Sequence, residues 1–116
     1  MSGENLKLRV SFGHSVAMGP GKADLLEAID ECGSISSAAK KMKMSYRRAW
    51  ELVDVMNKCF KQPLIATSLG GQHGGGAQVT EFGSFILKSY RDLISKANEF
   101  AQLEINQITS NLKNLD

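Results

Sequence analysis

The basic residues of this 116-residue sequence are concentrated in one short stretch. Residues 38–61 contain seven Lys or Arg and two Asp or Glu, a local charge of +5, whereas residues 1–37 sum to −2 and residues 81–116 to −1. Arginine can read guanine bidentately, and lysine binds backbone phosphates without reading sequence. The chemistry that these residues could support is therefore nucleic-acid binding. The alternative is an ordinary solvated surface.

The spacing around these charges predicts two helices. Ser36 can cap a short helix over residues 38–42, and Ser45 can cap a second helix. The apolar residues at helical spacing in the second helix are Ala49, Leu52, Val53, Met56 and Phe60. A short helix, a tight turn and a longer helix are typical of a helix-turn-helix, whose second helix reads the DNA major groove with its first turn.

The second helix has a predicted outer face. With Ala49 and Val53 turned inward, the residues on the opposite face are Arg47, Glu51, Asp54 and Lys58, with Arg48 and Trp50 on the flanks. We expect Trp50 to pack at the edge of the core. The residues of the helix-turn-helix expected to contact DNA are Ser36, Lys40, Lys41, Lys43, Ser45, Tyr46, Arg47 and Arg48.

The residues before this unit predict a strand, a loop and a helix. Residues 6–12 alternate between apolar and polar types, as in a half-buried strand. Residues 13–21 are typical of a loop, which ends in the Gly-Pro-Gly turn at 19–21. An apolar stripe predicts a helix over residues 22–32, which Gly33 can end in the left-handed conformation. This helix would complete a three-helix core.

A β-hairpin is predicted directly behind the helix-turn-helix. Pro63 prevents further helix, and residues 64–69 and 77–80 favour two short strands around the glycine-rich residues 70–76. Such a hairpin is the wing of a winged helix, and its tip can enter the minor groove. The wing residues expected to contact DNA are Gly71, Gln72, His73 and Gly74. The alternative is a merely flexible loop, since the nucleotide-binding pattern GxxxxGK[ST] is absent.

Residues 80–112 predict one long helix, with Thr80 as its cap and Glu81 at the positive end of its dipole. A helix of some 30 residues would extend about 45 Å, more than so small a domain can cover. Its distal apolar seam, over residues 101–115, has the heptad spacing of a coiled coil. The residues expected to form a dimer are Phe85, Tyr90, Leu93, Phe100, Ile105, Ile108 and Leu112. The alternative is a kink that folds the helix back on its own core.

Composition narrows the class of protein. With 42% hydrophobic and 22% charged residues, the sequence fits one small globular unit, in which residues 1–80 bind DNA and residues 81–116 dimerise. No nucleophile–base pair, carboxylate pair or metal cluster is visible, so no catalytic or metal site is predicted. Cys32 and Cys59 lack zinc-ligand spacing, and no apolar run approaches the roughly 20 residues that span a bilayer. We therefore expect a cytoplasmic protein that is not an enzyme. The predicted fold class is mainly α with a small β-wing.

Three segments resemble a known family. The run GSISSAAKKMKMSYRRAWELVDVMN at 33–57, the wing GGQHGGGA at 70–77 and VTEFG at 79–83 resemble the N-terminal DNA-binding domain of the molybdate-responsive ModE regulators. The initial segment is also similar to the LysR-type winged helix. The pairing of S-Y-x-x-A-W with a GG-x-x-GGGA wing is specific, and the resemblance covers nearly the whole chain. It implies operator binding by a homodimer, with the reading helix beginning at Ser45, Tyr46, Arg47 and Arg48.

The resemblance also bears on effectors. ModE proteins sense molybdate with molbindin-like C-terminal domains, and no oxyanion site is expected within these 116 residues. The sequence therefore predicts no cofactor, and molybdate is implied by the resemblance alone. The expected function is transcriptional regulation on double-stranded operator DNA. The alternative is an interaction module that has kept the fold and lost DNA binding.

Overall fold

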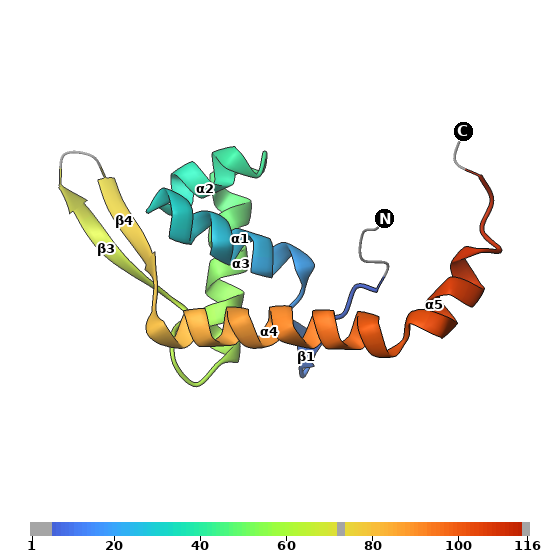
Figure 1. Ribbon diagram of the computed structural model, residues 1–116. Coiled ribbons are helices and arrows are strands. Elements are labelled where there is room, and N and C mark those ends of the chain that lie inside the picture. Colours follow the sequence, from blue (N-terminus) through green and yellow to red (C-terminus); the bar gives the residue numbers. More distant parts are fainter. Residues whose placement is uncertain (1–5, 72–73, 115–116) are drawn as a thin grey trace.

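A computed structural model describes residues 6–71 and 74–114, which form a three-helix core, a two-stranded wing and a pair of C-terminal helices (Figure 1). In chain order the elements are β1 Val10–Phe12, β2 Ser15–Met18, α1 Pro20–Cys32, α2 Ile35–Lys41, α3 Tyr46–Cys59, β3 Ile65–Gly71, β4 Gly74–Val79, α4 Glu81–Phe100 and α5 Gln102–Thr109. β1 pairs with β2 and β3 pairs with β4, both antiparallel. The predicted winged helix-turn-helix is confirmed.

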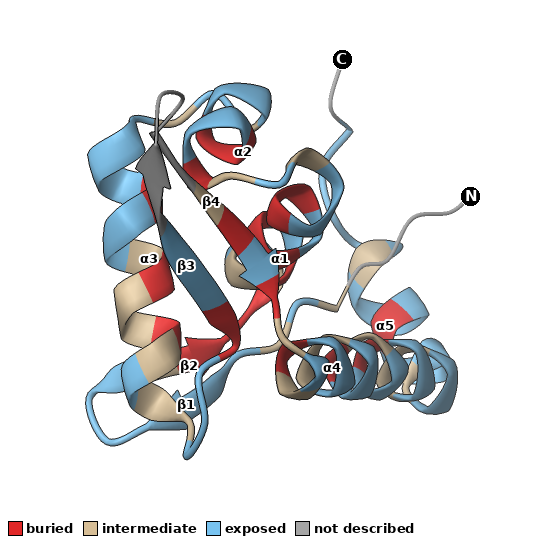
Figure 2. Cartoon of the chain, turned by 90° about the vertical axis from the view of Figure 1, so that its left-hand side faces the viewer, coloured by how far each residue is buried: buried red, intermediate tan, exposed pale blue. Residues whose placement is uncertain are grey.

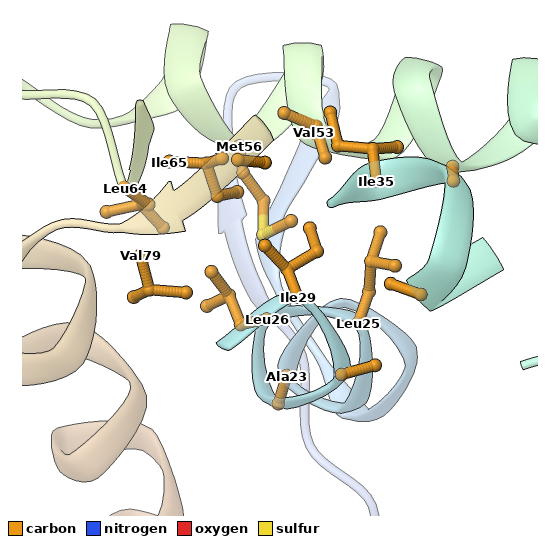
Figure 3. Packing of buried hydrophobic residues seen from close by; sticks show 14 of the residues in the cluster. Ala23, Leu25, Leu26, Ile29, Ile35, Val53, Met56, Leu64, Ile65 and Val79 are labelled. Atoms are coloured by element: carbon orange, nitrogen blue, oxygen red, sulfur yellow. The ribbon is translucent and has the colours of Figure 1, made fainter. Parts of the chain in front are cut away.

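The core lies where α1 and α3 meet the base of the wing. Figure 3 shows Leu26 and Ile29 of α1 facing Met56 of α3, with Leu64 and Val79 at the base of the wing. Four of these five side chains, all but that of Val79, are 0% exposed. Fully burying such a side chain contributes about 1.5–3 kcal/mol. The apolar cluster that holds α3 against α1 therefore also holds the wing.

The N-terminal strand is shorter and more exposed than its alternating sequence predicts. Of residues 6–12, only the last three form a strand, β1, and Phe12 within it is exposed. The preceding segment is held by α4 instead: the backbone N–H of Leu6 donates to Asn98 Oδ1 (3.2 Å), and the Tyr90 hydroxyl donates to Leu8 O (2.7 Å). Side chains of α4 thus replace the strand partner that the alternation implied.

The segment predicted as a loop, residues 13–21, contains β2 and the first turn of α1. Gly13 has a left-handed φ of 60° in the turn between β1 and β2. Pro20 and Gly21 belong to α1 rather than to a turn, because the fixed φ of proline suits the first helical position. The other end of α1 follows the prediction, since Gly33 has a φ of 79°.

The short helix α2 begins earlier than predicted. Its cap is Ser34, whose side-chain oxygen accepts a hydrogen bond from the N–H of Ser37 (3.0 Å). Ser36 lies inside the first turn and is exposed, so its predicted role as the cap is wrong. The earlier start brings Ile35 into the helix and into the core, where it is buried.

The sequence predicted one continuous helix from Thr80 to Leu112, but the structure has two helices there. The break is at Ala101, whose φ of −98° and ψ of 14° separate α4 from α5. Figure 1 shows α5 turning away from the axis of α4. Ile105 of α5 is buried in this arrangement. The predicted heptad seam over residues 101–115 begins at this break, and α5 ends at Thr109, before Leu112. Its use in a dimer stays a prediction, and Leu115 lies outside the described residues.

The first turn of α4 presses against the base of the wing. Thr80 caps the helix, accepting a hydrogen bond from the N–H of Gly83 (2.9 Å). A Cβ added at Gly83 would lie 2.2 Å from Leu64 O and 2.9 Å from Val79 Cγ1. Leu64 O is a backbone atom and cannot move aside cheaply. Glycine is required here by the close approach of two elements.

Gly83→Ala should lower the free energy of unfolding by about 3 kcal/mol, although alanine favours helix, because the new methyl group overpacks the junction. Gly21→Ala is the matched control. It also lies in a helix, and its added Cβ meets nothing within 4 Å. The control should leave stability unchanged or raise it by up to about 1 kcal/mol. Urea unfolding measures both variants, and equal stabilities would contradict the close approach.

Candidate nucleic-acid interface

The first turn of α3 presents two arginines to solvent. The Ser45 side chain accepts a hydrogen bond from the N–H of Arg48 (3.0 Å), so the predicted cap is confirmed. Ala49 and Val53 are fully buried, which turns the other face outward. The side chains of Arg47 and Arg48 are 91% and 62% exposed. Both guanidinium groups are therefore accessible to a ligand as large as DNA.

Glu51 lies next to both arginines. Its carboxylate is 3.5 Å from Arg47 Nε and 3.9 Å from Arg48 Nη1. Exposed ion pairs of this kind contribute less than about 1 kcal/mol. A phosphate or a guanine edge can therefore replace Glu51 at little cost, and the ion pairs leave the arginines available.

The lysines of the helix-turn-helix differ in their surroundings. Lys41 forms an ion pair with Glu31 of α1, and the hydrogen bond and negative charge of Glu31 raise the pKa of Lys41. Lys40 and Lys43 are exposed and belong to no ion pair among the described residues. Lys43 occupies the turn with a φ of 59°. The sequence had grouped these three lysines, but the structure separates Lys41 from the other two.

Tyr46 and Trp50 form a pair on the surface of α3. The indole Nε1–H of Trp50 donates to the Tyr46 hydroxyl oxygen (2.7 Å). Tyr46 is 53% exposed and Trp50 is 38% exposed. Trp50 was expected at the edge of the core, yet it lies on the surface with its N–H directed to Tyr46. The spacing of four residues in a helix was the available signal for this contact.

One hydrogen bond joins the wing to the end of α1, and another lies within the wing. The N–H of Ala77 on β4 donates to Gly33 O at the end of α1 (2.9 Å), and the N–H of Gly76 donates to Ser68 Oγ (3.2 Å). Gly71 pairs with Gly74 at the far end of the hairpin. Gln72 and His73, which were expected to contact DNA, lie outside the described residues. The predicted hairpin is confirmed, but its tip contacts stay a prediction.

A polar junction fixes the wing relative to α3. Asn57, near the end of α3, accepts from the N–H groups of Leu64 (2.9 Å) and Ile65 (3.2 Å) and donates to Ile65 O (3.0 Å). Directly after β4, the N–H of Thr80 donates to Leu64 O (2.9 Å) and its hydroxyl to Pro63 O (2.9 Å). Sequence reasoning missed Asn57, because its partners lie beyond the helix that contains it.

The geometry places the exposed arginines and the wing on one side of the molecule. Figure 1 shows the α2–α3 turn and the ends of β3 and β4 that lie away from α4 at the top of the view, with α4 at the bottom. Lys22, at the start of α1, is a further cation near Arg48. Burial first, and then the positive charges of Arg48 and Arg9, lower the pKa of Lys22. Arg48 thus has another cation beside it that sequence spacing did not identify.

The residues expected to dimerise fall into two groups. Tyr90 and Ile105 are buried within the chain itself. The exposed members are Phe85, Leu93, Phe100, Ile108 and Leu112. Figure 2 shows exposed surface along much of α4 and on the outer face of α3. A shared apolar surface would therefore depend on the second group, joined by the exposed Leu103 of α5.

Two negative findings apply to residues 6–71 and 74–114. No group of three or more His, Cys, Asp or Glu there is arranged to hold a metal ion. No helix among the described elements is both long and apolar enough to cross a membrane. Cys32 and Cys59 are free thiols.

Asn57→Ala should lower the free energy of unfolding by about 2–3 kcal/mol, because it leaves the N–H groups of Leu64 and Ile65 without their acceptor. Lys58→Ala is the control in the same turn, since Lys58 is exposed and pairs only with Asp54 among the described residues. Its cost should stay below about 0.5 kcal/mol. Chemical denaturation measures the free energy of unfolding of both variants. A loss of stability in Lys58→Ala as large as in Asn57→Ala would show that the junction has no special role.

No protein-family model matches the chain. Individual relatives do. The transcriptional regulator ModE of Haemophilus influenzae is 35% identical over 101 residues, which cover 87% of this chain and 39% of that protein. The molybdenum transport protein ModE of Azotobacter vinelandii is 46% identical over 69 residues, covering 60% of this chain and 26% of that protein.

The DNA-binding transcriptional dual regulator ModE of Escherichia coli is 35% identical over 82 residues, covering 71% of this chain and 31% of that protein. The chain thus spans less than two fifths of the length of these relatives. By sequence and by its winged-helix fold, the chain is a homologue of the ModE transcriptional regulators, matched over a part consistent with their N-terminal DNA-binding domain alone.

Proposed function

We propose that this chain is a sequence-specific DNA-binding regulator of transcription that acts as a homodimer. The first turn of α3 enters the major groove, and the wing lies beside it against the minor groove or the phosphates. The observation that carries the proposal is the exposure of Arg47 and Arg48 at a capped helix start, on the side of the molecule where the wing ends. The homology to proteins named as transcriptional regulators supports it.

The residues divide into readers and positioning groups. Arg47 and Arg48 read base edges, and a bidentate contact to guanine is worth about 1–3 kcal/mol of discrimination. Lys40 and Lys43 bind phosphates, which fixes the register of α3 without reading sequence. Lys41 contributes less, because binding a phosphate competes with its ion pair to Glu31.

Dimerisation is assigned to the C-terminal part, residues 81–116. The exposed apolar side chains of α4 and α5 would be covered by the same residues of a second copy, and that burial supplies the driving force. A twofold dimer presents two copies of α3 to half-sites about one DNA turn apart or a multiple of it. The bend at Ala101 makes this surface an angled one rather than a straight coiled coil.

Lys40→Ala and Lys43→Ala should each weaken binding to every duplex and lower the slope of log affinity against log salt by about 0.9, because one fewer phosphate is neutralised. Lys88→Ala on α4 is the control, since Lys88 lies outside the helix-turn-helix and pairs with Asp92 of the same helix; it should leave the slope unchanged. Fluorescence anisotropy with duplexes selected from a random pool measures all three. If the unaltered protein binds no duplex at low salt, the regulator proposal is wrong and an interaction module replaces it.

Phe100→Ser should shift the protein toward monomer and weaken its affinity for a two-half-site duplex more than for a single half-site. Its side chain is 93% exposed, so its removal costs the monomer little. Lys96→Ser is the control on the same helix. Sedimentation equilibrium gives the oligomeric state. A monomeric unaltered protein, or a Phe100 variant that dimerises as the unaltered protein does, would contradict this surface.

A further inference from the structure

The hydrogen bond between Trp50 and Tyr46 leaves the tyrosine with an unused donor. A phenolic oxygen carries one proton and can also accept. Because it accepts from Trp50 Nε1–H at 2.7 Å, its own proton points elsewhere. Within the part of the chain that the structure describes, no acceptor is hydrogen-bonded to that proton. A donor is thus held in place at the exposed start of α3.

We propose that Trp50 is a positioning residue that holds the Tyr46 hydroxyl ready to donate a hydrogen bond to a DNA backbone phosphate. This inference rests on the proposed function and deepens it. Neither residue carries charge in this role. Tyr46 would contact the phosphate, and Trp50 would act only through Tyr46.

The surroundings of Tyr46 favour an anionic oxygen as the acceptor. Tyr46 is the first residue of α3, where the positive end of the helix dipole lies. Arg47 follows it, and Lys43 lies just before the cap at Ser45. A hydrogen bond to a charged acceptor is also stronger than one to a neutral base edge.

The indole contributes in two ways. It restricts the tyrosine ring before DNA arrives, so less side-chain freedom is lost on binding. It also polarises the phenol, since an oxygen that accepts one hydrogen bond donates the next more strongly. Both effects act through one N–H group. Replacing that group should therefore matter only while the tyrosine hydroxyl is present.

A double-mutant cycle on the intact chain tests this coupling. Tyr46→Phe should weaken binding about tenfold, the effect of one hydrogen bond to a charged group, equally for a duplex selected from a random pool and for a shuffled duplex. The salt slope should not change, because a neutral donor releases no counterion. Trp50→Phe should weaken binding about threefold, and the double variant should bind no more weakly than Tyr46→Phe alone.

Two further measurements separate positioning from a structural effect. Replacement of Trp50 by benzothienylalanine keeps the bicyclic ring and removes only the N–H, and it should reproduce the threefold loss without changing the unfolding midpoint. Trp50 is the single tryptophan of the chain, so its emission should shift on DNA binding in the unaltered protein and less in Tyr46→Phe.

Several outcomes would overturn the inference while leaving the proposed function intact. These are losses that multiply in the double variant, a benzothienylalanine variant that binds as the unaltered protein does, or a Tyr46→Phe loss confined to the selected sequence. The last result would mean that Tyr46 reads a base. If the unaltered protein binds neither duplex at low salt, the proposed function fails and this inference fails with it.

Discussion

The backbone of Leu64 is held from two sides, and the positions of three functional parts depend on it. Asn57 of α3 accepts from its N–H, and Thr80, the cap of α4, donates to its carbonyl oxygen. Gly83 allows α4 to approach that same carbonyl. The reading helix, the wing and the C-terminal helix are therefore joined at one residue. A substitution at this junction would change the angle between α3 and the wing without removing any group that faces DNA.

The electrostatics of the DNA-facing side are more balanced than the local charge of residues 38–61 suggests. Glu51 lies beside Arg47 and Arg48, Glu31 holds Lys41, and Asp54 holds Lys58. Such surface pairs are weak, so they do not prevent binding. They do reduce the attraction to phosphates in general. In the proposed function, a duplex that offers the arginines a guanine edge gains relative to one that offers phosphates alone, which favours specificity over bare affinity.

Much of the fold could be predicted, because its determinants are local. The cap at Ser45, the inward side of α3 and the left-handed Gly33 follow from residue types at short spacing. The hairpin followed from a proline, two apolar runs and the glycines between them. These signals need no knowledge of distant partners.

The errors share a different cause. The first strand was predicted too long because Leu6 and Leu8 are held by residues of α4 more than 80 positions away. The helix over residues 80–112 was predicted continuous because its apolar spacing does not report the break at Ala101. The role of Asn57 was missed for a similar reason, since its hydrogen-bond partners, Leu64 and Ile65, come after the helix that contains it. For the first strand and for Asn57, the deciding partners lie outside the element that contains the residue.

One measurement tests most directly whether the start of α3 and the wing form a single DNA-binding surface. Backbone amide NMR signals of the intact chain would be followed while a selected duplex is added. We expect the largest shifts at residues 43–48 and along β3 and β4, with small shifts along the exposed face of α4. Shifts confined to α4 and α5, or to α3 without the wing, would contradict it.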